Sequence, residues 1–136
     1  MASANRMSAS RICLAEKNNN NQEAVGGMSL ETKFSNTQLR RINLQSILYL
    51  CSCPSQVGVQ IDSLRKLYEY QANCADRERS ELQRQVHERI AEAAIAAHRL
   101  MEDCLQDVLN LEGWDPATLE MPEGLRTLLE QEIEDR

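Results

Sequence analysis

The chain contains neither glycine nor proline between Val59 and Glu112. Its five glycines and three prolines all lie outside this window, and Gly58 and Gly113 frame it. Glycine and proline are the residues that most readily interrupt a helix. The window therefore predicts a long helix or a helical hairpin, with a contour of about 80 Å at about 1.5 Å per residue.

The sequence predicts an all-α fold, a small helical bundle built around a long central helix or helical hairpin, with homodimerisation expected. Residues 1–27 are predicted to be a disordered leader, and residues 28–136 a single helical domain. We expect helices over about 37–52, 58–112 and 122–134. The composition of the leader also resembles that of an organelle transit peptide, so organelle targeting is the alternative to a cytoplasmic location.

A polar stretch over residues 73–80 interrupts the apolar pattern of the long window. Asn73 or Asp76 could cap a new helix there, which would give a hairpin. Tight helix–helix connections favour glycine, however, and none is present. A continuous helix with at most a mild hinge near residues 73–80 is therefore favoured over the hairpin.

Several residues mark the expected helix ends. Any of the residues 35–37 could cap the first helix, which should end at Cys53 because the residue before a proline avoids helical geometry. Gly113 has the position of a left-handed residue after a helix, and Trp114 is expected to fold back on the last turn. Pro122 suits the first turn of the C-terminal helix.

Apolar residues recur every three or four positions along the long helix, which predicts a buried stripe that continues through Cys104, Val108 and Leu111. The alanine-rich segment 91–97 should let a neighbouring helix cross closely. An elongated helix buries too little surface alone, so part of the stripe should meet a partner. The residues that we expect to make this interaction are Leu82, Val86, Ile90, Ala93, Ala97 and Leu100, with Leu125, Leu128, Leu129 and Ile133 as a second surface.

The net charge of −6 is unevenly distributed. Residues 101–136 hold eleven acidic and two basic residues, a net charge of −9, whereas the first hundred residues carry +3. The acidic third would repel nucleic acid. The basic residues are interspersed with acids and no aromatic platform accompanies them, so nucleic-acid binding is not expected. A nucleic-acid-associated regulator that uses Arg77, Arg79, Arg84 and Arg89 is one alternative function.

The five cysteines are an odd number and fit free thiols in a reducing compartment. Cys51 and Cys53 are too close in sequence for a usual structural zinc pair, and the others are isolated. Cys104 is expected to be a small core residue. His98 and Glu102, four residues apart, could form half of a metal site, although a hydrogen-bonded surface pair is favoured. A metal- or thiol-dependent helical bundle that uses this pair and the cysteines is the other alternative function.

We find no phosphate-binding glycine loop, serine nucleophile elbow, His-Glu-x-x-His or calcium loop in the sequence. No apolar run approaches the roughly 20 residues of a membrane span. The sequence therefore predicts no enzymatic activity, no cofactor or metal, and no membrane partner. The function expected is that of a non-enzymatic helical protein–protein interaction module: an assembly factor, adaptor, chaperone or complex subunit.

Overall fold

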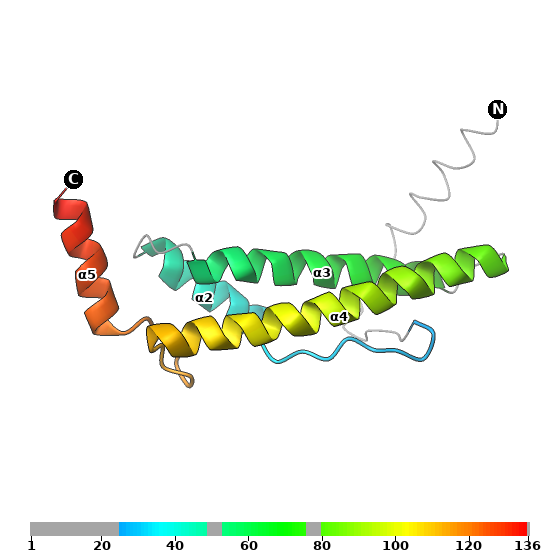
Figure 1. Ribbon diagram of the computed structural model, residues 1–136, viewed down its shortest axis with the longest axis horizontal. Coiled ribbons are helices and arrows are strands. Elements are labelled where there is room, and N and C mark those ends of the chain that lie inside the picture. The colour runs from blue at the N-terminus through cyan, green and yellow to red at the C-terminus, as the bar shows by residue number, and fades with distance from the viewer. Residues whose placement is uncertain (1–24, 49–52, 76–79, 136) are drawn as a thin grey trace, which may run out of the picture. The chain divides into compact units, whose positions relative to one another are not determined.

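The computed structural model describes residues 25–48, 53–75 and 80–135 of the chain (Figure 1). Within these ranges the fold is all-helical and contains no strand, which confirms the predicted all-α class. Side chains are described throughout these ranges except at Ala75, Arg126 and Leu129. The helices are α2 (Asn36–Leu48), α3 (Cys53–Ala75), α4 (Glu81–Glu112) and α5 (Glu123–Glu134).

The predicted leader over residues 1–27 lies outside the described residues as far as residue 24. Its last three residues belong to a tight turn, in which the N–H of Val25 donates to the carbonyl of Met28 at 2.9 Å and the reverse bond has the same length. Gly26 and Gly27 make this turn with φ values of 57° and 77°. Val25 is 1% exposed, so ordered and packed chain begins before the predicted boundary.

The described chain divides into two compact units. The first unit comprises residues 25–31 and 64–97, and the second comprises residues 32–63 and 98–135. Helices α3 and α4 each pass from one unit into the other along the chain. Each unit has a hydrophobic cluster of its own.

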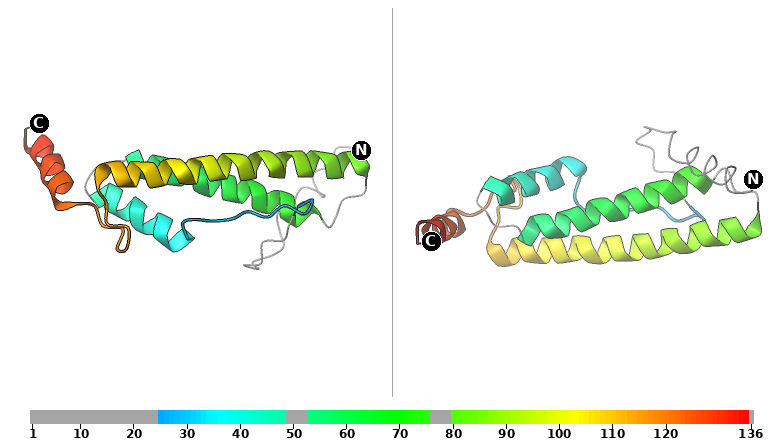
Figure 2. Two further views of the ribbon diagram at one scale, coloured as in Figure 1. Left: turned by 60° about the horizontal axis from the view of Figure 1, so that its bottom comes forward. Right: turned by 90° about the horizontal axis from the view of Figure 1, so that it is seen from above.

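Helices α3 and α4 form a hairpin. In the first unit, Tyr68 on α3 shares a hydrophobic cluster with Ala91 on α4, and the end of α3 lies beside the beginning of α4 (Figures 1 and 2). A continuous helix would hold these two residues about 35 Å apart at about 1.5 Å per residue. The continuous helix favoured from the sequence is therefore wrong. Asn73 lies inside α3, and Ser80 caps α4 by accepting the N–H of Gln83 at 3.1 Å.

Helix α3 begins five residues earlier than the predicted residue 58. Pro54 lies in its first turn, where the missing N–H of proline has no intrahelical acceptor to lose. The proline therefore lies at the start of a helix and not after the end of one, and Cys53 belongs to α3 and not to the first helix as predicted. Gly58, expected at the start of this helix, lies in its interior. The predicted end of the first helix, over residues 49–52, lies outside the described residues.

The predicted signals at two other helix ends are confirmed. Ser35 caps α2 in a reciprocal arrangement: its hydroxyl accepts the N–H of Gln38 at 3.1 Å, and the Gln38 side chain accepts the N–H of Ser35 at 2.8 Å. Gly113 ends α4 with φ 79° and donates to the carbonyl of Asn110. Trp114 donates its backbone N–H to the carbonyl of Leu109 at 3.0 Å, which completes a Schellman motif and folds the indole onto the last turn.

The two hydrophobic clusters differ in side-chain size. In the second unit, the chain just before α2, α2 itself, the start of α3, the end of α4 and the loop after α4 contribute large residues: Phe34, Leu39, Ile42, Ile61, Leu105, Leu109, Trp114, Leu119 and Met121. The first unit packs a smaller set between the chain before α2 and the two hairpin helices: Val25, Leu30, Tyr68, Ala72, Ala91 and Ala94. Ala91 and Ala94 of the alanine-rich segment belong to this cluster together with Tyr68 and Ala72 of α3.

Candidate interaction surfaces

The buried face of α4 is rotated from the predicted one. In the first unit the buried residues are Ala91 and Ala94, each one position after the predicted Ile90 and Ala93. In the second unit the buried residues on α4 are His98, Glu102, Leu105 and Leu109. A shift of one residue turns a helical face by about 100°. The predicted stripe is consequently beside the packed face and not on it.

In the first unit, the predicted interaction residues of α4 form an uncovered apolar surface, which we call the α4 stripe. Leu82 is 70% exposed and Val86 is 47% exposed. Ala93 is exposed, while Ile90 and Ala97 are half-buried. These residues recur at steps of four, four, three and four, so they lie on one side of the helix. The described chain therefore leaves Leu82, Val86 and Ala93 exposed and covers Ile90 and Ala97 in part.

The remaining predicted residues belong to the second unit. Leu100 on α4 is 70% exposed. On α5, Leu125 is half-buried against the hydrophobic cluster, whereas Leu128 is 60% exposed and Ile133 is 49% exposed. The side chain of Leu129 lies outside the description. The predicted surface on α5 is therefore packed against the hydrophobic cluster at Leu125 and exposed at Leu128 and Ile133.

The structure adds a surface on α2 that the sequence did not predict. Leu44, Ile47 and Leu48 are 54%, 61% and 61% exposed, while the opposite side of α2 buries Leu39 and Ile42. In the sequence this helix has a wide apolar face that includes Leu39, Ile42, Ile47 and Leu48. Its width was the available signal, because a helix of 13 residues seldom buries apolar side chains on more than one side.

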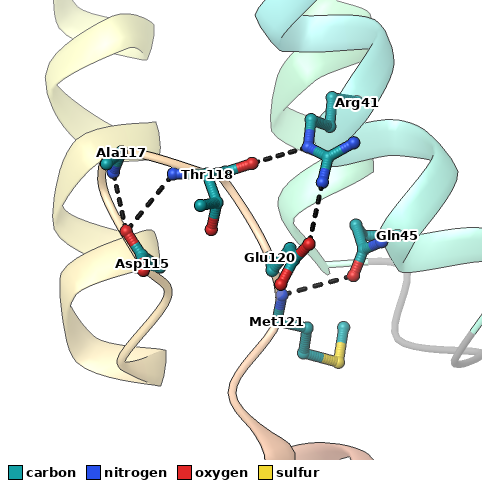
Figure 3. Close-up of polar contacts among 7 residues, drawn as sticks. All are labelled: Arg41, Gln45, Asp115, Ala117, Thr118, Glu120 and Met121. Atoms are coloured by element: carbon teal, nitrogen blue, oxygen red, sulfur yellow. Dashed lines mark hydrogen bonds and ion pairs between the residues drawn. The ribbon is translucent and has the colours of Figure 1, made fainter.

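The loop between α4 and α5 is fastened to α2 (Figure 3). The Arg41 guanidinium donates to the carbonyl of Thr118 at 2.5 Å and pairs with Glu120 at 3.1 Å. Gln45, one turn farther along α2, accepts the backbone N–H of Met121 at 3.3 Å. These contacts fix the place from which α5 starts.

Asp115 shapes the same loop. Its carboxylate accepts the N–H of Ala117 at 2.8 Å and that of Thr118 at 3.2 Å (Figure 3). These two hydrogen bonds lower the pKa of the Asp115 carboxyl, since they favour its charged form. Farther along the loop, Leu119 has a φ of 56°, which is strained for a leucine. Its side chain is 5% exposed and packs in the hydrophobic cluster.

The pair of His98 and Glu102 is buried, which corrects the expectation of a surface pair. Both residues are at most 2% exposed, with His98 Nδ1 3.5 Å from Glu102 Oε1. The other carboxylate oxygen of Glu102 accepts the backbone N–H of Lys33 at 2.8 Å and of Phe34 at 3.0 Å. This carboxylate holds the chain that enters α2. Among the described residues, no group of three or more potential ligands is arranged to hold a metal ion.

The cysteines are also distributed differently from the prediction. Cys104, expected in the core, is exposed, because the buried face of α4 passes through Leu105. Cys53 is exposed as well, and Cys74 is buried. None of these three cysteines is in a disulfide, and Cys51 lies outside the described residues.

The arginines named for nucleic-acid binding are divided. Arg77 and Arg79 lie outside the described residues. Arg84 forms an ion pair with Glu81 and approaches Glu88 at 3.8 Å. Arg89 is exposed. The described arginines therefore share the surface with acids, as the sequence indicates.

The second unit contains a cavity of about 170 Å³ between the start of α2, the end of α4 and the loop that follows. Its ionisable lining groups are already engaged: Lys33 pairs with Asp103, and Asp115 accepts two loop N–H groups. Its other lining groups are amide and apolar side chains and the indole of Trp114, whose buried Nε1 has no hydrogen-bond partner among the described residues.

The prediction that the chain is not an enzyme stays a prediction.

Comparison of the chain with protein families, with curated proteins and with solved structures finds no match. In the described ranges, no helix has the combined length and apolar character needed to cross a bilayer.

Proposed function

We propose that the chain is a non-enzymatic helical interaction module, and that the α4 stripe receives a helix of a protein partner. The observation that carries the proposal is the exposure of Leu82 and Val86 at helical spacing while Ala91 and Ala94 supply the packed face. Burying a leucine or valine side chain stabilises a complex by about 1.5–3 kcal/mol before the costs of association. An assembly factor, adaptor, chaperone or complex subunit would use such a surface.

The small residues of the α4 stripe favour a helical partner over a loop. Ala93 and Ala97 follow the larger Leu82, Val86 and Ile90, so a helix could approach α4 closely at one end. The larger residues at the other end would pack against the partner helix as anchors. This division is typical of an amphipathic helix in a groove, with anchors at steps of three and four.

The test is the double substitution Leu82→Asp and Val86→Asp in the full chain. Both side chains are exposed, so helix content and melting temperature should stay near those of the parent. The partner bound in the native source should be lost from affinity purification with quantitative mass spectrometry. Gln85→Asp, an exposed position on another side of α4, is the matched control and should retain it. Recovery of the same proteins with all three chains would refute the proposal.

A further inference from the structure

We infer that two copies of the chain pair through reciprocal antiparallel contacts, in which α2 of each copy packs against α5 of the other. This inference concerns the second unit and is independent of the partner proposed for the α4 stripe. We infer a second copy of the chain as the partner because α2 carries exposed leucines and arginines, and α5 carries an exposed leucine and acidic residues that can pair with them.

Both helices present an uncovered column of residues at steps of four. On α2 the column is Arg40, Leu44 and Leu48, all exposed, with Ile47 beside it. On α5 the column is Gly124, Leu128 and Glu132, also exposed. The helices have 13 and 12 residues, so their lengths match. Ile133 lies on another side of α5 and takes no part.

One antiparallel register satisfies all three positions. With Leu44 opposite Leu128 of the second copy, Arg40 falls opposite Glu132 and Leu48 falls opposite Gly124. A Cβ atom at Gly124 would meet nothing within 4 Å, so there is open space for Leu48 above this glycine. The register thus joins a leucine pair, an ion pair, and a leucine over a residue without a side chain.

The charges of the two helices support this orientation. Helix α2 has no acidic residue in its first turn and carries Arg40 and Arg41 soon after. Helix α5 has no basic residue in its last turn, which holds Glu132 and Glu134. Each end opposes its own helix dipole. Antiparallel packing brings the acidic end of α5 to the basic end of α2 and relieves both.

The α5 helix of the same copy does not occupy the α2 surface. Leu44, Ile47 and Leu48 are all more than half exposed, and α5 extends away from α2 in the views of Figures 1 and 2. The contacts of Arg41 and Gln45 hold the loop before α5 against α2. A two-fold axis relates the two copies, so the same contact forms twice. In each contact, α2 of one copy packs against α5 of the other.

The test exchanges the charges of the proposed ion pair. The side chain of Arg40 has one described contact, with the Thr37 hydroxyl at 3.2 Å, and both Arg40 and Glu132 are exposed, so Arg40→Glu and Glu132→Arg should leave the fold intact. In light scattering over a concentration series, the parent chain should have the mass of two copies. Each single variant should dissociate at least tenfold more readily, because two like-charged contacts replace two ion pairs. Glu130→Arg, on another side of α5, should behave as the parent.

Mixing the two single variants identifies the second copy. A dimer of one Arg40→Glu chain and one Glu132→Arg chain carries opposite charges at both contacts, so the mixture should recover the mass of two copies. The double variant Arg40→Glu with Glu132→Arg in one chain is the comparison. If it regains the mass of two copies while the mixture of single variants does not, the contact lies within one chain and the inference is overturned. A parent chain that is monomeric throughout, or single variants that dimerise like the parent, would also overturn it. The Leu82→Asp and Val86→Asp variant should keep the mass of two copies, which separates this inference from the proposed function.

Discussion

The two compact units hold the chain that precedes α2 by different chemistry. In the first unit, the neutral Tyr68 hydroxyl donates to the carbonyl of Met28 at 3.0 Å. In the second, the Glu102 carboxylate accepts the N–H of Lys33 and of Phe34. A hydrogen bond to a charged group contributes about twice as much as one between neutral groups. The hydrogen bonds that hold the chain before α2 are therefore stronger in the second unit than in the first.

The apolar packing differs in the same sense. The second unit buries Ile61 and Leu105 completely, whereas the residues of α4 that pack in the first unit are Ala91 and Ala94. Burial of apolar surface scales with side-chain size, so the first unit gains less from its helix contact. We infer that the second unit supplies more of the stability, and four substitutions test this difference.

The largest effect is expected from Leu105→Ala. This side chain is fully buried in the cluster of large residues, so its removal should leave a cavity and lower the free energy of unfolding by about 2–5 kcal/mol. Leu82→Ala, at a leucine that is 70% exposed on the same helix, should change it by less than about 0.5 kcal/mol. Urea unfolding followed by circular dichroism measures both. Equal effects would mean that Leu105 is not a core residue.

Glu102→Ala should have the next largest effect. It removes the acceptor of two backbone N–H groups, one of them buried, and should cost about 1.5–3 kcal/mol. Amide hydrogen exchange at Lys33 and Phe34 should accelerate, while exchange at Val25 in the first unit should change less. Glu102→Gln keeps one acceptor oxygen and should cost less than the alanine variant. An alanine variant as stable as the parent would contradict the assigned role of the carboxylate.

Tyr68→Phe removes the neutral hydrogen bond from the Tyr68 hydroxyl to the Met28 carbonyl and should lower the free energy of unfolding by about 0.5–1.5 kcal/mol. Burial raises the pKa of the Tyr68 phenol above its usual 10.0, although nearby backbone groups at Val25 and Leu30 partly offset this. A raised pKa in the folded state gives stability that is present below pH 10 and lost as the pH rises through the folded pKa. The parent should therefore lose more stability than the variant between pH 9 and pH 12 in urea titrations. Parallel losses would show that Tyr68 titrates as in the unfolded chain.

The sequence predicted the features that depend on a few neighbouring residues. Ser35 and Gln38 make a local cap, and Gly113 with Trp114 makes a local helix end, so the pattern at each site contains the whole interaction. The all-helical class follows in the same way from the spacing of apolar residues. These signals need no knowledge of distant contacts.

The sequence failed where distant segments decide the outcome. The packed face of α4 includes His98 and Glu102, which count as polar in any periodicity, although Glu102 is buried by bonds to a segment almost 70 residues away. The more hydrophobic stripe beside it was therefore taken for the core. The hairpin was the less favoured of two alternatives for a similar reason, because Tyr68 and Ala91 pack in one cluster although no glycine or proline marks a turn between them.

The smallest expected effect is a gain from Gly58→Ala. Gly58 lies inside α3 in the second unit, and a Cβ atom there would meet nothing within 4 Å. Glycine in a helix interior is less favourable than alanine by about 0.5–1 kcal/mol, so the variant should be more stable by that amount. Gly113→Ala is the matched control: its φ of 79° suits glycine, and the same added methyl group should destabilise the chain. A loss of stability in the Gly58→Ala variant would mean that residue 58 does not lie in the helix interior, and that α3 begins close to the predicted residue 58.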